Sequence, residues 1–164
     1  MVYGVYSEGF RVGGVNRGLR GSQGGSVLPV AYDSDLVENT EFGLKSEFAD
    51  GRILFNAVYY EMTWDDMQIE VTDPASSQGW APFQIVVANV GTGDIKGFDL
   101  EFKALITENL EVGMNFNDIQ DAEVSAPSQY PDSRSETGFV DSGLAPSTPL
   151  PLFADQSYSL YAEY

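Results

Sequence analysis

Apolar and polar residues alternate strictly from Phe98 to Phe116, and this alternation predicts a β-hairpin. The apolar positions of the two runs are Phe98, Leu100, Phe102, Ala104 and Ile106, followed by Leu110, Val112, Met114 and Phe116. The positions between them carry polar, charged or small residues, namely Asp99, Glu101 and Lys103, followed by Glu111, Gly113, Asn115 and Asn117. A period of two is typical of a strand with one apolar and one polar face. The segment Thr107-Glu108-Asn109 between the runs predicts the turn.

The length of these two strands changes what the alternation means. Strands of ordinary globular proteins are usually about 5–6 residues long. A strand that crosses a lipid bilayer needs roughly 9–11 residues, with apolar side chains toward lipid and polar side chains toward the barrel interior. The hairpin strands reach that length, so we expect their apolar positions to face lipid.

Alternation elsewhere predicts four more strands, which makes six long strands in all. Their approximate bounds are Val2 to Phe10, Val37 to Phe48, Arg52 to Asp66, the two hairpin strands, and Gln156 to Tyr164. The apolar faces of the second, third and sixth strands are predicted to be Phe42, Leu44 and Phe48; Leu54, Val58, Tyr60, Met62 and Trp64; and Tyr158, Leu160, Ala162 and Tyr164. We expect these three sets to join those of the hairpin in one lipid-facing band.

Short and long connections alternate along the chain. Strands two and three are joined by Ala49-Asp50-Gly51-Arg52, in which Asp-Gly is a tight-turn signal, and the hairpin turn is equally short. The other joins are long, roughly Arg11 to Leu36, Met67 to Gly93 and Asp121 to Asp155, and they hold all eight prolines. In an up-and-down sheet this places the short turns at one rim and the long loops at the other, as in outer-membrane barrels.

Composition excludes several classes of function. The net charge of −17 opposes binding to nucleic acid, because little in the chain would neutralise phosphates. Histidine and cysteine are absent, which removes imidazole bases, Ser-His-Asp triads, disulfides and thiol chemistry. A barrel enzyme would need paired carboxylates, and no spacing supports such a pair. We therefore expect no enzyme activity and no cofactor. No run of about 18 apolar residues occurs, so no transmembrane helix is expected. The opening residues also lack the pattern of a signal peptide.

A soluble β-sandwich that binds a ligand or glycan is the alternative fold, since its strands also alternate. Strand length and the confinement of long loops to one rim favour the membrane barrel. Aromatic residues near strand ends also favour it, because they suit the interfacial girdles of a barrel. These residues are Tyr59, Tyr60, Trp64, Tyr158, Tyr161 and Tyr164.

Four segments resemble the barrel of TonB-dependent outer-membrane receptors. Tyr3 to Asn16 resembles the family pattern Y-x-x-Y-S-x-G-F-R-x-G-G-x-N, and Leu36 to Ser46 is similar to x-V-E-N-Y-E-L-G-x-K. Asp50-Gly51-Arg52, followed by Asn56 to Tyr60 and by Trp64 to Gln68, resembles the next strand of the family. Asn89 to Glu101 resembles N-A-G-x-x-x-x-x-G-x-E-x-E. The segments occur in family order and cover most of the chain.

The resemblance implies an all-β, antiparallel, up-and-down transmembrane barrel in the outer membrane of a Gram-negative cell. Receptors of this type close with about 22 strands, so six strands predict an open partial barrel over residues 1–164, without the plug domain. The whole receptor would take up a scarce nutrient such as a ferric siderophore. Its partners would be outer-membrane lipid, its own plug, a small-molecule ligand and, through the missing N-terminal part, the TonB complex. Alone in water the piece is expected to aggregate or stay unfolded.

Candidate functional residues fall into two groups. In the extracellular loops, arginines suit an anionic ligand and aromatic residues suit a capture surface; they are Arg11, Arg17, Arg20, Trp80, Phe83 and Tyr130. Contact of the arginines with lipopolysaccharide phosphates and packing of the aromatics within the loops are the alternatives. Charged residues predicted to face the lumen and the plug are Glu41, Lys45, Glu47, Asp99, Glu101, Lys103 and Glu111. The acidic pairs at 33–35 and 65–66 lack the pattern of a calcium loop, so no metal site is expected.

Overall fold

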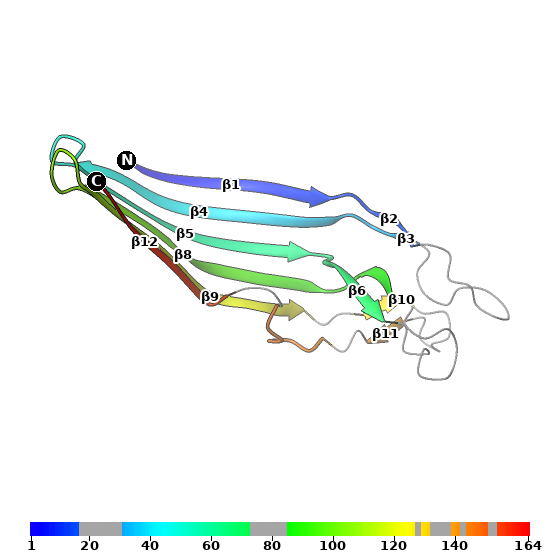
Figure 1. Ribbon diagram of the computed structural model, residues 1–164. Helices are drawn as coiled ribbons and strands as arrows, with labels where there is room; N and C mark the ends of the chain where they lie inside the picture. The colour runs from blue at the N-terminus through cyan, green and yellow to red at the C-terminus, as the bar shows by residue number, and fades with distance from the viewer. Residues whose placement is uncertain (17–30, 73–84, 127–128, 132–138, 142–143, 151–153) are drawn as a thin grey trace.

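Six long antiparallel strands form one twisted sheet in the computed structural model, which describes residues 1–16, 31–72, 85–126, 129–131, 139–141, 144–150 and 154–164. The strands lie side by side in the order β1-β4-β5-β8-β9-β12 (Figure 1). Their bounds are Val2–Arg11 for β1, Asp35–Phe48 for β4, Ile53–Asp65 for β5, Thr92–Leu105 for β8, Glu111–Ala126 for β9 and Gln156–Glu163 for β12. The predicted strands and their up-and-down order are confirmed. The sheet is open, because β1 and β12 form its two edges.

Three short hairpins extend the sheet at one end, within the joins that the sequence treated as loops. They pair β2 (Gly14–Val15) with β3 (Ala31–Tyr32), β6 (Gln68–Thr72) with β7 (Ile85–Asn89), and β10 (Gln129–Pro131) with β11 (Phe139–Asp141). Figure 1 shows them at the end opposite the short turns and the two chain termini. Asp66 and Gly91 have positive φ values of 51° and 58° where the β6–β7 hairpin leaves the main sheet. The long connections therefore contain β-structure of their own.

The short turns lie at the other end. Between β4 and β5, three successive residues have positive φ, namely Ala49 at 54°, Asp50 at 56° and Gly51 at 81°. This confirms the tight turn predicted from Asp-Gly. Arg52 joins the two turns of this rim, since its guanidinium donates to the carbonyl oxygens of Leu105 at 3.0 Å and Ile106 at 3.1 Å. Of the described residues, none forms a helix that is long and apolar enough to span a membrane.

One face of the sheet is concave. Residues that pair across neighbouring strands share a face, and one such face surrounds a hollow of about 630 Å³. All six strands contribute to its lining, through Tyr3, Lys45, Asn56, Glu101, Asn115 and Ser159. Because both edge strands border the same hollow, the sheet curves around it.

The opposite, convex face carries a continuous apolar band. Its members on the five strands from β4 to β12 are Phe42, Leu44 and Phe48; Ile53, Phe55, Ala57 and Tyr59; Phe98, Leu100, Phe102 and Ala104; Val112, Met114 and Phe116; and Tyr158, Leu160 and Ala162. Many are open to the surroundings, with Phe42 64% and Leu160 71% exposed. An exposed apolar band on the outside of a curved sheet is typical of the lipid-facing surface of a membrane barrel.

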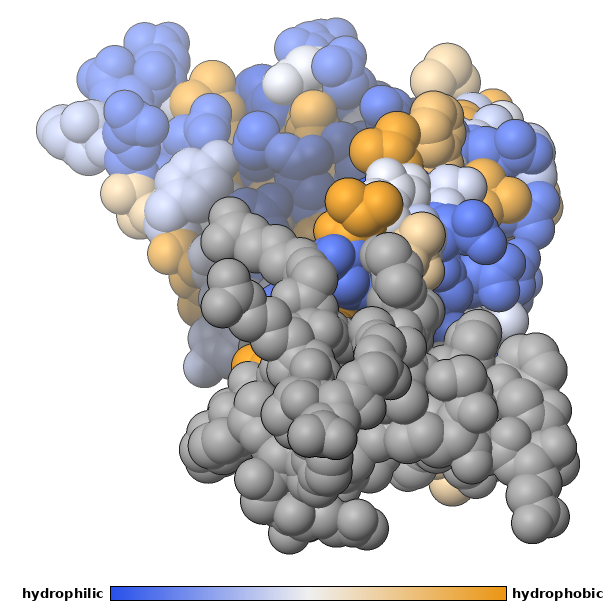
Figure 2. All heavy atoms as spheres, turned by 90° about the vertical axis from the view of Figure 1, so that its right-hand side faces the viewer, coloured by the Kyte–Doolittle hydropathy of each residue, from blue (hydrophilic) through white to orange (hydrophobic). Residues whose placement is uncertain are grey.

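The band ends toward the hairpins at the pair Tyr59 and Phe98, whose ring centroids are 4.9 Å apart. Beyond this pair the convex side of β5 and β8 becomes polar, with Glu61 opposite Lys96 and Thr63 opposite Asp94. Seen from the hairpin end, the described surface is largely hydrophilic with apolar residues interspersed (Figure 2). The chemical boundary therefore crosses the strands part of the way along their length.

The face predicted for the apolar set of the third strand is wrong. In the register of β5 with β8, Leu54 pairs with Lys103 and Val58 with Asp99, so both point to the concave side. Tyr60, Met62 and Trp64 share that parity and lie there too. On the convex side of β5 their places are taken by Ile53, Phe55, Ala57 and Tyr59.

The predicted aromatic girdle is accordingly wrong in part. Tyr60 and Trp64 pair with Gly97 and Gly93 on the concave face. Tyr161 lies there as well, over Gly113. Tyr59 and Tyr158 are convex, as expected. Tyr164 follows the end of β12 and is 94% exposed.

Tyr60 and Trp64 pack in a small core near the hairpin end of the concave face. Its buried members are Tyr60, Met67, Ile95, Val124 and Leu150. Leu150 belongs to a segment that returns along β9, where its N–H donates to the Ala122 carbonyl at 2.8 Å. The concave face thus has an apolar, covered half near the hairpins and a polar, open half near the short turns.

Candidate functional site

The polar half of the concave wall holds the charged residues that the sequence assigned to the lumen. The strand registers place all seven, namely Glu41, Lys45, Glu47, Asp99, Glu101, Lys103 and Glu111, on the concave face. Their contact with a plug stays a prediction.

Several of these side chains pair with one another or with neighbouring polar groups. Lys103 forms an ion pair with Glu101 at 2.8 Å, and the Asn56 amide donates to the other oxygen of Glu101 at 2.8 Å. Asn117 donates to Asp99 at 2.6 Å. The Lys45 ammonium lies over the Tyr3 ring, 5.4 Å from its centroid. The wall therefore presents a hydrogen-bonded polar surface with more acidic than basic groups.

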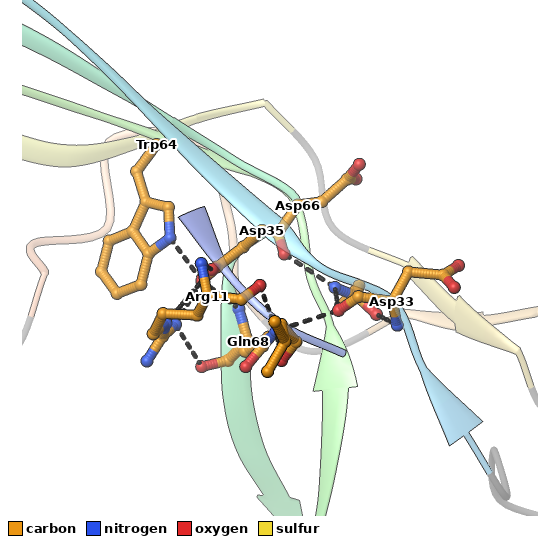
Figure 3. Close-up of polar contacts among 8 residues, drawn as sticks. Arg11, Asp33, Asp35, Trp64, Asp66 and Gln68 are labelled. Carbon is orange, nitrogen blue, oxygen red and sulfur yellow. Dashed lines mark hydrogen bonds and ion pairs between the residues drawn. The ribbon is translucent and has the colours of Figure 1, made fainter. Parts of the chain in front are cut away.

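A second polar cluster lies at the base of the hairpins, centred on Asp35, the first residue of β4 (Figure 3). Only 2% of Asp35 is exposed. Its carboxylate accepts hydrogen bonds from the backbone N–H of Arg11 at 3.1 Å and from the Arg11 guanidinium, whose Nε lies 2.9 Å away. It also accepts from the Trp64 indole at 2.8 Å and from the backbone N–H of Gln68 at 3.3 Å. We call Arg11, Asp35, Trp64 and Gln68 the Asp35 clamp.

The clamp lies beyond the apolar band, because Asp35 comes seven positions before Phe42, the first band residue of its strand. Burial alone would raise the pKa of Asp35, but the hydrogen bonds from Arg11, Trp64 and Gln68 outweigh it and lower that pKa to about 2. Asp35 in turn raises the pKa of Arg11, whose guanidinium also stacks 5.0 Å from the centroid of the Trp64 ring. Both groups are therefore charged at neutral pH.

Side-chain amides continue the network from the clamp to the hairpins. The Gln68 amide donates to the carbonyl oxygens of Asp33 at 2.9 Å and Val12 at 3.1 Å. The Asn89 amide accepts from the Asp33 N–H at 2.7 Å and donates to the carbonyl oxygens of Asp33 at 3.0 Å and Asp66 at 2.9 Å. These bonds connect the backbone at the base of the first hairpin with side chains of the second.

The residues predicted to bind a ligand are only partly placed. Arg11 belongs to the clamp, and its guanidinium is already engaged by Asp35. Arg17, Arg20, Trp80 and Phe83 lie outside the described residues, and so does the side chain of Tyr130. Within the described part of the chain, no group of acidic residues is arranged to hold a metal ion.

The clamp was not predicted from the sequence, although part of its signal is present there. Arg11 ends the first strand and Asp35 begins the second, so an antiparallel pairing places them opposite each other, as the register shows. Trp64 was assigned to the lipid face, which hid its indole as a donor. Gln68 and Asn89 carried no pattern that distinguishes them from loop residues.

Comparisons with known proteins agree with this architecture. A family model described as TonB dependent receptor-like, beta-barrel matches residues 1–164. A search of curated proteins gave no match. Among solved structures, one entitled "Structure of the RagAB peptide transporter" is similar with a TM-score of 0.54 and 14% sequence identity, over 99% of this chain and 25% of that chain.

The structural likeness establishes a shared fold, and the chain spans about a quarter of the length of the transporter chain it matches. The family match extends over every residue and agrees with the convex apolar band, the polar concave face and the alternation of short turns with long hairpins. The chain therefore belongs to the TonB-dependent receptor β-barrel family, whose barrels stand in the outer membrane.

Proposed function

We propose that the chain supplies part of the wall and three extracellular hairpin loops of an outer-membrane receptor that imports a scarce nutrient such as a ferric siderophore. The observation that carries the proposal is the division of the sheet into an exposed apolar convex band and a polar concave wall around a hollow. A soluble β-sandwich would bury its apolar faces between two sheets. Here the apolar band lies on the outside of the curve instead.

The rest of the receptor completes the device in this proposal. Six strands form an open sheet, so further strands would close the barrel and a plug domain would fill it. The charged concave residues would then meet the plug, and the TonB complex would act through the N-terminal part of the receptor. No catalytic step is involved.

The ligand is the finer part of the proposal. Arg17 and Arg20 are the other two arginines that the sequence places in the first loop, and an anionic iron chelate suits a pair of guanidinium groups. The similar solved structure is named a peptide transporter. An oligopeptide is therefore the comparison ligand in the test.

The test is uptake by cells that carry the complete receptor, measured with radioactive iron bound to a siderophore and with a labelled oligopeptide. We expect iron uptake that requires the receptor and an active TonB complex. Substituting Arg17→Gln and Arg20→Gln together should reduce uptake at least threefold at limiting ligand. Arg52→Gln, at the opposite rim, is the matched control and should leave uptake unchanged.

Two results would contradict the proposal at different levels. Receptor-dependent uptake of the peptide without uptake of iron would replace the siderophore and keep the importer. Recovery of the receptor in the soluble fraction would refute the membrane reading altogether.

A further inference from the structure

The β2–β3 and β6–β7 hairpins come from different joins of the chain but lie next to each other. The first extends strands β1 and β4, and the second extends strands β5 and β8. A two-stranded ribbon on its own is marginally stable in water. Each hairpin therefore depends on contacts that it makes with its surroundings.

Side-chain amides join the two hairpins directly. The Asn16 amide, which follows β2, donates to the Val87 carbonyl at 2.9 Å and accepts from the Val87 N–H at 2.9 Å. Asn89 of β7 forms the same kind of two-way bond with the backbone of Asp33, which follows β3. Each amide thus forms the pair of hydrogen bonds that a backbone peptide group forms in an antiparallel sheet, and so links the two hairpins.

The Asp35 clamp lies where the bases of the two hairpins meet (Figure 3). From the first side it receives the backbone and guanidinium donors of Arg11, and from the second side the Trp64 indole and the Gln68 N–H. Every one of these partners is a donor, so a carboxylate, which only accepts, fits the position. An asparagine would have to turn its NH₂ group toward at least one of them.

We propose that Asp35 couples the two hairpins, so that a displacement of one is transmitted to the other. The hydrogen bonds of Asp35 to Arg11, Trp64 and Gln68 would have to break before either hairpin could move alone. The coupling is a property of the wall itself and holds for whichever ligand the receptor carries. It makes the β2–β3 and β6–β7 hairpins, which are distant in sequence, respond as one unit.

Pulsed electron paramagnetic resonance on the complete receptor in lipid tests the proposal. This chain has no cysteine, so spin labels can be attached at Val15→Cys on β2 and Ile85→Cys on β7, whose side chains are 75% and 58% exposed. We expect one narrow distance distribution in the parent receptor and a distribution at least twice as broad with Asp35→Asn. Asp94→Asn is the matched control, because Asp94 accepts one bond from Thr63 outside the clamp.

Reciprocal hydrogen exchange separates coupling from a local structural role. Asn89→Ala, in the second hairpin, should raise amide exchange in β2–β3 at least tenfold, and Arg11→Gln should raise it in β6–β7 by a similar factor. Exchange at the short turns should stay constant in both. Effects confined to the substituted hairpin, or a distance distribution in Asp35→Asn equal to that in Asp94→Asn, would overturn the proposal.

The milder substitution Trp64→Phe guards against a receptor that fails to assemble. It removes one donor to Asp35 and keeps an aromatic ring beside Arg11. We expect intermediate broadening between the parent and Asp35→Asn. A folded Trp64→Phe receptor with a parent-like distribution and parent-like exchange in both hairpins would count against the coupling.

Discussion

Replacing Phe55 by arginine tests the assignment of the two faces of β5, because the adjacent residue Leu54 provides a matched control. Phe55 pairs with Phe102 on the convex face, whereas Leu54 pairs with Lys103 on the concave face. The two positions lie at almost the same height on one strand. A positive charge should therefore be costly at position 55 and tolerated at position 54.

The place of Phe55 in the apolar band sets the size of the effect. The band on β5 runs from Tyr59 to Ile53, which is about 20 Å along a strand. Phe55 lies well inside it, near the level where an arginine on the lipid side of a barrel costs about 2–4 kcal/mol. That cost lowers the folding equilibrium constant by about 30- to 900-fold.

The control substitution places its guanidinium in a different environment. Leu54 lies between Glu47 on β4 and Lys103 on β8. Its arginine would gain one ion pair and one repulsion in water, which together change stability by less than about 1 kcal/mol. The difference between the two variants should therefore be about 1–3 kcal/mol or more.

The assay is a urea titration of the complete receptor in lipid vesicles, followed by the change in gel mobility between folded and unfolded barrel. We expect a clear fall in the unfolding midpoint for Phe55→Arg and little change for Leu54→Arg. The reverse order would refute the register of β5 and restore the face predicted from the sequence. Equal loss in both variants would refute the claim that the concave side of this strand meets water.

Three further predictions concern single positions. Gly97→Ala should lower the free energy of unfolding by about 2 kcal/mol in the urea titration, because a Cβ there would overlap the Asp118 carbonyl oxygen and the Tyr60 ring. Gly9→Ala, with no atom within 4 Å of its Cβ, should change that free energy by less than about 0.5 kcal/mol. Ala49→Gly should stabilise the barrel by about 0.5–1 kcal/mol in the same titration, since it relieves a φ of 54°. Because the pKa of Asp35 is lowered to about 2, the contribution of the clamp is fully present above about pH 4–5 and is lost as the pH falls toward 2, so the spin-label distances should be constant from pH 7 to pH 5 and broaden only near pH 3 and below.

The sheet could be predicted because each of its strands carries a long alternating pattern and each short turn has a local signature. Strand β8 is unambiguous, because every second residue from Phe98 to Ala104 is apolar and each of the three residues between them is charged. The turn of Asp50 and Gly51 fixes the register of β4 with β5. Alternation and turn-forming residues are local features, so they can be read directly from the sequence.

The Asp35 clamp could not be predicted in the same way, because it joins residues from four segments. Trp64 and Gln68 reach Asp35 only after β5 has paired with β4 and the chain has turned at Asp66. None of these contacts has a periodic signal. The hairpins in the long joins escaped for a related reason, because their strands are short and side-chain amides such as Asn16 connect them to one another.

The wrong face of β5 has a specific physical cause in the two adjacent tyrosines of the strand. As far as Tyr59 the apolar convex positions are the odd ones, and from Tyr60 onward the apolar positions are the even ones, which face the covered core near the hairpins. Glu61 and Thr63 then occupy the convex side above the band. Alternation reports which residues share a side, but it does not report whether lipid or protein covers that side. The neighbouring strand β8, apolar on one side only within the band, settles the question through its register. In β5 the convex apolar band ends at Tyr59 and the buried concave core begins at Tyr60, so we expect the edge of the membrane to lie close to these two residues.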